Sequence, residues 1–202
     1  MRTAILASGR GSNLQAIVKE WQSGHLPIEI VAVGSDQPDA LALKYAQKAG
    51  ITVKVFSKAE YPDRVFQEEG LLSWFKESSV ELLLLAGYMK VLSEYFIEKV
   101  EFPILNIHPS LLPAFPGLHA QRQALEYGVK FSGCTVHYVD KGLDSGPIIL
   151  QEAVPVLADD TEDTLAQRIL EVEHHIYPLA VNLVAGNKLE RKGRRVLVKV
   201  DS

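Results

Sequence analysis

The stretch Val80-Glu81-Leu82-Leu83-Leu84-Leu85-Ala86 is apolar at every position except Glu81. A strand with one face in water alternates apolar and polar residues, whereas a parallel strand covered on both faces is apolar almost throughout. The run is also too short for a typical helix. It therefore predicts a buried central strand of a parallel sheet.

Shorter apolar runs on either side of this stretch also have the character of strands, and helix-like segments or short loops separate them. Two of the helices have recognisable ends, since Gly50 follows one and Ser93 opens another. Alternation of strands and helices predicts an α/β fold with a doubly wound, mostly parallel sheet of the Rossmann-like kind. The additional strands are expected at residues 3–7, 28–33, 51–56 and 104–107, and the two helices at 40–49 and 94–99.

The pattern changes in the C-terminal part of the chain. Residues 135–139 and 148–156 resemble two strands joined by a tight loop at 140–147, which predicts a hairpin added to the sheet. A long helix over about 162–185 should close the domain. Its predicted apolar stripe consists of Leu165, Ile169, Val172, Ile176, Leu179 and Leu183.

Length and composition restrict the class of protein. With 202 residues and 47% hydrophobic content, the chain can bury a sizeable core, and we expect a single domain over residues 1–202. The formal net charge of −4 gives no basic footprint for nucleic acid. Lys and Arg concentrate only at 188–195, which we interpret as a solvated turn before a last strand.

Other features bear on the compartment and on metals. A single cysteine, Cys134, excludes an internal disulfide and fits a reducing compartment. The N-terminal apolar run stops at Ser8, too early for a signal peptide or a membrane span, so we expect a cytoplasmic protein without a membrane partner. His174 and His175 are adjacent, which is a poor metal-binding spacing, and no metal is expected. The sequence does not set the oligomeric state.

A glycine-containing loop follows the first predicted strand and precedes a helix, in the order Ser8-Gly9-Arg10-Gly11-Ser12-Asn13. Glycines allow close backbone approach, and free amides at a helix start favour an anion such as phosphate. Ser12 and Gln15 also fit a capping box. The dinucleotide fingerprint is incomplete because Leu14 stands in place of the third glycine. The loop alone is equally consistent with an ordinary tight turn.

Asn106 and His108 end an apolar run that stops at Pro109. Residues i and i+2 of a strand point to the same side, so the two side chains should share one face. An amide that donates to an oxyanion beside an imidazole that carries a proton is suited to acyl transfer. Asp144 in the hairpin loop is the carboxylate expected to favour the charged form of His108. Each group also has a structural interpretation, as a polar strand end or a loop cap.

Glu173 flanks the apolar stripe of the predicted long helix, where it would line a cleft and accept hydrogen bonds from sugar hydroxyls. A surface glutamate is an equally simple interpretation.

Taken together, these segments resemble one family, the folate-dependent phosphoribosylglycinamide formyltransferases of purine synthesis. The matching segments are ordered along almost the whole chain, and their combination is far more specific than any one of them. They are Gly11-Ser12-Asn13, residues 85–92, 106–113, 115–119, 135–137 and 143–147, Glu173-His174 and Ile176-Tyr177-Pro178.

The resemblance implies transfer of the formyl group of 10-formyltetrahydrofolate, a co-substrate, to the amine of glycinamide ribonucleotide. It implies a trio of Asn106, His108 and Asp144, and no metal. It also implies a phosphate-binding lobe over 1–100 and a folate and catalytic lobe over 101–202. The ribonucleotide would be bound by Gly11, Ser12, Asn13 and Glu173, and the folate by Arg64, Met89, Lys90, Val91, Leu92, Asn106, Asp140, Leu143 and Asp144.

Two further expectations concern Lys90 and the hairpin loop. Lys90 stands where the family commonly has Arg, so a bidentate or stacked guanidinium contact is in doubt. Gly142 and Gly146 bracket the hairpin loop, and we expect that loop to be mobile until folate orders it.

Other functions remain open at this point. A formyltetrahydrofolate deformylase or a methionyl-tRNA formyltransferase would share the Asn-His-Asp core, although those families carry an extra domain for which this chain is too short. A non-catalytic nucleotide-binding module would keep the loop without the chemistry. A nicotinamide oxidoreductase is disfavoured by the incomplete glycine fingerprint.

Overall fold

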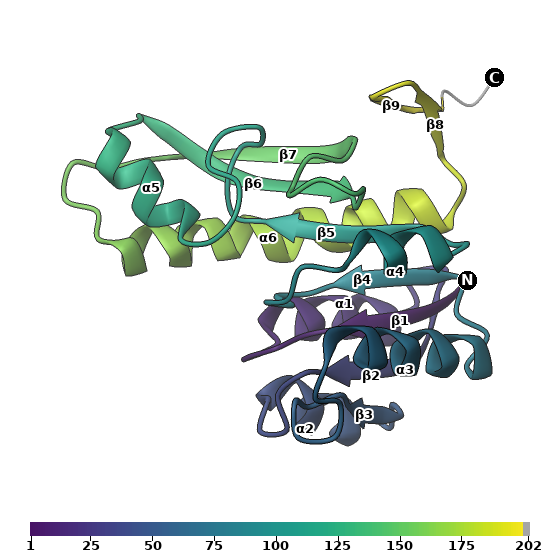
Figure 1. Ribbon diagram of the computed structural model, residues 1–202. Helices are drawn as coiled ribbons and strands as arrows, with labels where there is room; N and C mark the ends of the chain where they lie inside the picture. Colours follow the sequence, from purple (N-terminus) through teal and green to yellow (C-terminus); the bar gives the residue numbers. More distant parts are fainter. Residues whose placement is uncertain (200–202) are drawn as a thin grey trace. The chain divides into compact units, whose positions relative to one another are not determined.

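The computed structural model describes residues 1–199, and the chain forms two compact units, Met1–Leu105 and Asn106–Ser202. The first unit alternates strands and helices (Figure 1). Its elements are β1 (Arg2–Leu6), α1 (Ser12–Gln22), β2 (Glu29–Ser35), α2 (Leu41–Lys48), β3 (Val53–Val55), α3 (Arg64–Glu77), β4 (Leu82–Leu85), α4 (Glu94–Lys99) and the start of β5 (Ile104–His108).

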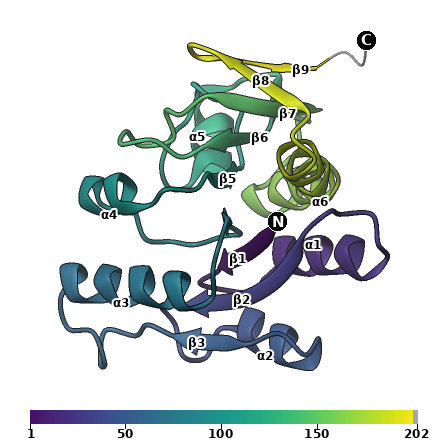
Figure 2. The same cartoon turned by 90° about the vertical axis from the view of Figure 1, so that its right-hand side faces the viewer.

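The sheet of the first unit is parallel, with β1 paired to both β2 and β4, and β2 paired to β3. Leu82, Leu83 and Leu84 of β4 are fully buried, as their unbroken apolar run predicted. Figure 2 shows α1 and α2 on one face of this sheet and α3 and α4 on the other. Cover on both faces explains why β4 has no polar side, and it confirms the doubly wound arrangement.

The second unit contains the predicted hairpin and the predicted long helix. Its hairpin strands are antiparallel, and the long helix packs against both of them. The larger sheet has the order β3-β2-β1-β4-β5-β6-β7, which confirms a mostly parallel sheet with an added hairpin. The elements that follow β5 are α5 (Ala120–Tyr127), β6 (Phe131–Tyr138), β7 (Ile148–Pro155), α6 (Glu162–Ala185), β8 (Leu189–Lys192) and β9 (Arg195–Val198).

Two predictions about the second unit were wrong in detail. Leu179 was assigned to the apolar stripe of α6 but is 45% exposed, whereas Glu173 and Tyr177 are buried. The buried face of α6 follows an i, i+4 spacing that runs from Leu165 and Ile169 to Glu173 and Tyr177. The predicted stripe was assigned from hydrophobicity alone and therefore did not match this face. The basic segment 188–195 was expected as a turn, yet most of it forms the paired strands β8 and β9. No helix among residues 1–199 has the length and apolar character required to span a membrane.

Candidate functional site

The glycine loop of the first unit joins β1 to α1. Helix α1 begins at Ser12, and its N-cap is Gly11 with a φ of 74° and no side-chain cap. The capping box predicted for Ser12 and Gln15 is therefore wrong, because Ser12 already lies inside the helix. A Cβ at position 11 would lie 2.7 Å from the Cβ of Ala42, so only glycine fits. Helix N-termini in general favour anions, so phosphate binding at the first turn of α1, next to buried Asn13, stays a prediction.

Ser8 connects this loop to the segment that follows β4. Its hydroxyl donates to Asp36 Oδ1 at 2.5 Å and accepts from the amide of Met89 at 2.9 Å. The amide of Ser8 also donates to the carbonyl of Gly87 at 3.0 Å. The predicted phosphate loop and the predicted folate segment are thus held together within one unit.

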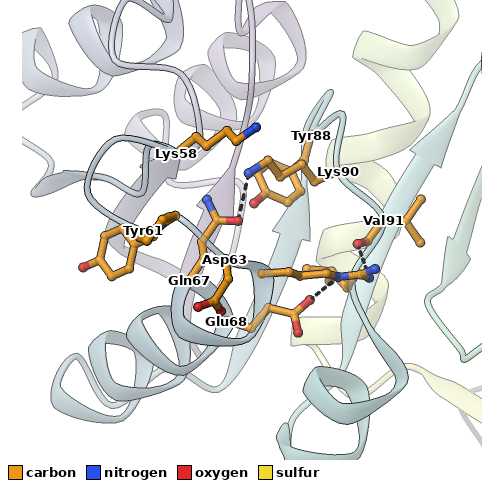
Figure 3. Close-up of a pocket in the computed structure, with 11 residues that line it drawn as sticks. Lys58, Tyr61, Asp63, Gln67, Glu68, Tyr88, Lys90 and Val91 are labelled. Carbon is orange, nitrogen blue, oxygen red and sulfur yellow. Dashed lines mark hydrogen bonds and ion pairs between the residues drawn. The ribbon is translucent and has the colours of Figure 1, made fainter.

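A pocket of about 340 Å³ lies between the start of α3 and the segment after β4 (Figure 3). Arg64 donates from Nε to Glu68 Oε1 at 3.2 Å and from Nη2 to the carbonyl of Val91 at 2.6 Å. Glu68 is buried and also accepts from the amide and the hydroxyl of Ser93. A buried carboxylate therefore fixes both the arginine and the chain that follows β4.

Three further polar groups line the same pocket. Lys90 donates to Gln67 Oε1 at 2.9 Å, so its ammonium group has a partner within the pocket. Burial, with smaller effects of nearby carboxylates, raises the pKa of Tyr88 far above its usual range. Lys58 also lines the pocket and was not predicted from the sequence, since a single lysine in a loop carries no pattern.

The structure brings four of the predicted folate-binding residues into this pocket, namely Arg64, Lys90, Val91 and Leu92. Met89 is exposed and contributes its backbone amide to Ser8 instead.

In the second unit, His108 and Asp144 form a largely buried pair. His108 Nδ1 lies 3.3 Å from Asp144 Oδ2, and the two side chains are 6% and 12% exposed. His108 Nε2 lies 2.8 Å from the carbonyl oxygen of Phe115, while the amide of Gly117 donates to Asp144 Oδ2 at 2.8 Å. Both ring nitrogens of His108 thus face acceptors, an arrangement that a charged imidazolium satisfies completely. Sequence reasoning paired these two residues, and the structure places them in contact.

Asn106 contacts His137, and His137 lies close to Asp144 of this pair. His137 was not predicted as a site residue from the sequence. Asn106 Nδ2 lies 3.2 Å from His137 Nε2, which is itself 3.8 Å from Asp144 Oδ1. His137 is 2% exposed, and burial is the largest cause that lowers its pKa. The available signal was strand alternation, because residues 135 and 137 of β6 share a face.

The hairpin loop that carries Asp144 is held by several internal contacts. Asp140 Oδ1 accepts from the amide of Gly142 at 3.1 Å and from the hydroxyl of Ser145 at 2.6 Å. A Cβ at Gly146 would lie 1.7 Å from the carbonyl oxygen of Tyr138. The glycines of this loop therefore serve close packing.

Three more features of the loop bear on its predicted mobility. Arg194 donates to the carbonyl of Ser145 at 2.6 Å, which attaches the loop to the turn between β8 and β9. Asp144 has a φ of 49°, a left-handed conformation that Asp tolerates better than most residues. Leu143 at the tip is 55% exposed. The hydrogen bonds of Asp140 and Arg194 hold the loop in this conformation, and its mobility stays a prediction.

Glu173 is on the buried face of α6 and is 6% exposed, so it is not the surface glutamate considered above. Its charge is one cause, after burial, that raises the pKa of Cys134. Carboxylates are rarely so buried unless they are paired. Within residues 1–199, no group of three or more His, Cys, Asp or Glu side chains is arranged to hold a metal ion.

Comparisons with known proteins identify the family of this chain. The formyl transferase family matches residues 1–181. The trifunctional purine biosynthetic protein adenosine-3 of Drosophila pseudoobscura pseudoobscura is 47% identical over 94% of this chain, which spans only 14% of that protein's length. The phosphoribosylglycinamide formyltransferase of Escherichia coli K12 is 40% identical, over 94% of this chain and 90% of the relative.

A solved structure agrees over nearly the full length. The crystal structure of glycinamide ribonucleotide transformylase 1 from Symbiobacterium toebii matches with a TM-score of 0.96 and 48% identity, over 99% of this chain and 94% of that one. On these grounds the chain belongs to the formyl transferase family.

Proposed function

We propose that this protein transfers the formyl group of 10-formyltetrahydrofolate to the amine of glycinamide ribonucleotide, a step of de novo purine biosynthesis. The observation that carries the proposal is the largely buried His108–Asp144 pair with the Asn106 amide beside it. Its support from similarity is the name shared by full-length bacterial relatives and solved structures.

The reaction would proceed by direct attack of the amine nitrogen on the formyl carbon. A bond forms between these two atoms, the bond from the formyl carbon to N10 of the folate breaks, and a proton passes from the amine to N10. A side-chain amide directed at the oxyanion of the tetrahedral intermediate can lower the barrier by about 3 to 4 kcal/mol. We assign this role to Asn106.

His108 would act mainly as a fixed positive charge next to the oxyanion. Its Nδ1 faces Asp144 and its Nε2 faces the Phe115 carbonyl, so a direct hydrogen bond from Nε2 to substrate requires that carbonyl to move. Asp144 holds both the charge and the orientation of the ring. No covalent enzyme intermediate is needed in this scheme.

The ribonucleotide would bind through its phosphate at the start of α1, where Gly11, Ser12 and Asn13 supply the anion site described above. Glu173 would accept hydrogen bonds from the ribose hydroxyls. Both assignments rest on residue type and on the resemblance.

In the first unit, the folate would contact the pocket of Figure 3. Arg64, Lys90 and Lys58 line that pocket and offer cations to the glutamate carboxylates of the folate tail. The segment Met89 to Leu92, with Asp140, Leu143 and Asp144 and the amide of Asn106, would contact the pterin and the formyl group. The folate is a co-substrate, no step above needs a metal, and we place the reaction in the cytoplasm.

The test follows the absorbance of the folate product after mixing the protein with 10-formyltetrahydrofolate, with and without glycinamide ribonucleotide. Formation of product only when the ribonucleotide is present supports the proposal. Equal rates without the ribonucleotide would indicate hydrolysis of the formyl group to formate and would reject it.

A further inference from the structure

We propose that His137 is a positioning residue that fixes the orientation of the Asn106 amide by accepting a hydrogen bond from it. The kinetic consequence rests on the proposed function, in which Asn106 donates to the oxyanion. The hydrogen-bond arrangement itself does not, and it can be tested without substrate.

The direction of this hydrogen bond follows from the other side of the His137 ring. Nδ1 lies 2.9 Å from the carbonyl oxygen of Tyr138, and a carbonyl oxygen only accepts. Nδ1 therefore carries the proton, and in a neutral ring Nε2 is left with a lone pair. Burial favours the neutral ring. Only the NH₂ end of Asn106 can pair with that lone pair at 3.2 Å, so the amide cannot flip without losing a hydrogen bond.

His137 lies next to an irregularity in the pairing of β6 with β7. The β6–β7 register shifts between Val136 and His137, so that Ile149 of β7 is an extra residue at this point. A bulge bends the strand that carries the extra residue, here β7, and bulges are frequent next to active sites. Thr135, two residues earlier on the same face, donates to the Ser110 carbonyl at 2.7 Å and accepts from the Leu112 amide at 3.0 Å. This face of β6 thus supports the chain at and after the end of β5 at two points.

Protonation of His137 would reverse the arrangement. A proton on Nε2 would remove the acceptor for Asn106 and would face Asp144 Oδ1, 3.8 Å away. Asn106 would then turn its oxygen toward His137, and Asp144 would be shared between two charged rings. The charged groups around His137 are Asp144 and Asp140, which favour protonation, and His108, which opposes it. The neutral ring is therefore required for the orientation of Asn106 and for an undivided His108–Asp144 pair.

Two substitutions separate positioning from simple packing. In His137→Gln the side-chain oxygen can occupy the place of Nε2 and keep an acceptor, whereas His137→Leu keeps bulk without one. We expect His137→Leu to lower kcat by about 10- to 100-fold with little change in either KM, approaching the loss caused by removing the amide itself. His137→Gln should retain most of the activity. His175→Gln is the matched control, because His175 is exposed and lies outside the site.

A double-mutant cycle tests whether His137 acts through Asn106. On an Asn106→Ala background, His137→Leu should lower kcat by no more than about twofold, since the group that it orients is already gone. Losses that multiply in full would overturn the proposal, as would equal losses for His137→Gln and His137→Leu at equal thermal stability.

The substrate-free test is ¹⁵N NMR of the histidine rings at neutral pH. We expect His137 to show a protonated Nδ1 and a lone-pair Nε2, and the Asn106 side-chain amide resonances to move in His137→Leu. A protonated Nε2 at neutral pH would overturn the proposal. Since this measurement needs no formyl transfer, it decides on His137 even for a chain that fails the functional test above.

Discussion

The two compact units present polar groups in different ways. The glycine loop of the first unit offers backbone amides at the start of α1, and its pocket offers long cationic side chains that are partly exposed. In the second unit, Asn106, His108, His137 and Asp144 are short side chains, mostly buried and mutually hydrogen-bonded or paired. Backbone amides and flexible cations suit the binding of anions, whereas a rigid buried cluster suits stabilisation of charge that exists only during a reaction. The difference predicts that substitutions in the glycine loop and the pocket of the first unit alter binding, whereas substitutions in the buried cluster of the second unit alter turnover.

The largest effect is expected for the His108–Asp144 pair. His108→Ala should lower kcat by about 10²- to 10⁴-fold, and Asp144→Asn should also lower it strongly, because both act on charge in the transition state. The dissociation constant of glycinamide ribonucleotide, measured by calorimetry, should change little. Near-normal turnover in His108→Ala would contradict a catalytic role of the pair. A large loss of ribonucleotide affinity would contradict the assignment of the pair to turnover alone.

The second prediction uses two glycines of the same loop as a matched pair. Gly11→Ala should destabilise the protein by about 1 to 3 kcal/mol, since its Cβ would collide with Ala42 and its φ is positive. Gly9 has no atom within 4 Å of the Cβ position, so Gly9→Ala should leave stability unchanged.

Thermal unfolding and the KM for the ribonucleotide check this pair together. If phosphate binds here, Gly9→Ala should raise that KM without loss of stability, because the new methyl group would meet only the ligand. Normal KM values for both substrates in Gly9→Ala would indicate that the phosphate does not bind at this loop.

The third prediction concerns the folate side of the first unit. Arg64→Ala should raise the KM for the folate by about 5- to 20-fold and leave that for the ribonucleotide nearly unchanged, since one charged hydrogen-bonding group is lost. The increase should be larger with a polyglutamated folate. Lys48→Ala, an exposed change on α2, provides the control. Equal increases for both substrates would mean that Arg64 supports the fold of the pocket through Glu68 and Val91.

The contrast between the units also explains which structural features could be predicted from the sequence and which could not. The strands, the hairpin and α6 were predictable because periodicity and apolar runs report burial directly, as in β4. The contact between His108 and Asp144 could be anticipated from residue types, yet His137 could not, because its role depends on a cross-strand partner. The cap of α1 was misassigned because Ser12 fits a capping pattern, while the left-handed Gly11 ends the loop one residue earlier.

The smallest expected effect is a pH dependence of stability. Burial lowers the pKa of His137 and of His174 from the ordinary value of 6.5. Below that value the unfolded chain binds protons that the folded chain resists, so stability falls as the pH decreases from about 6.5 toward the folded-state pKa values. The thermal midpoint should therefore fall over this range, and His137→Gln should reduce the fall because it removes one of the two groups. His175→Gln, at an exposed position, is the matched control for replacement of a histidine by glutamine. An identical slope in His137→Gln would show that His137 takes up its proton as readily in the folded chain as in the unfolded one, and the neutral ring required by the Asn106 contact would then be lost near pH 6.5.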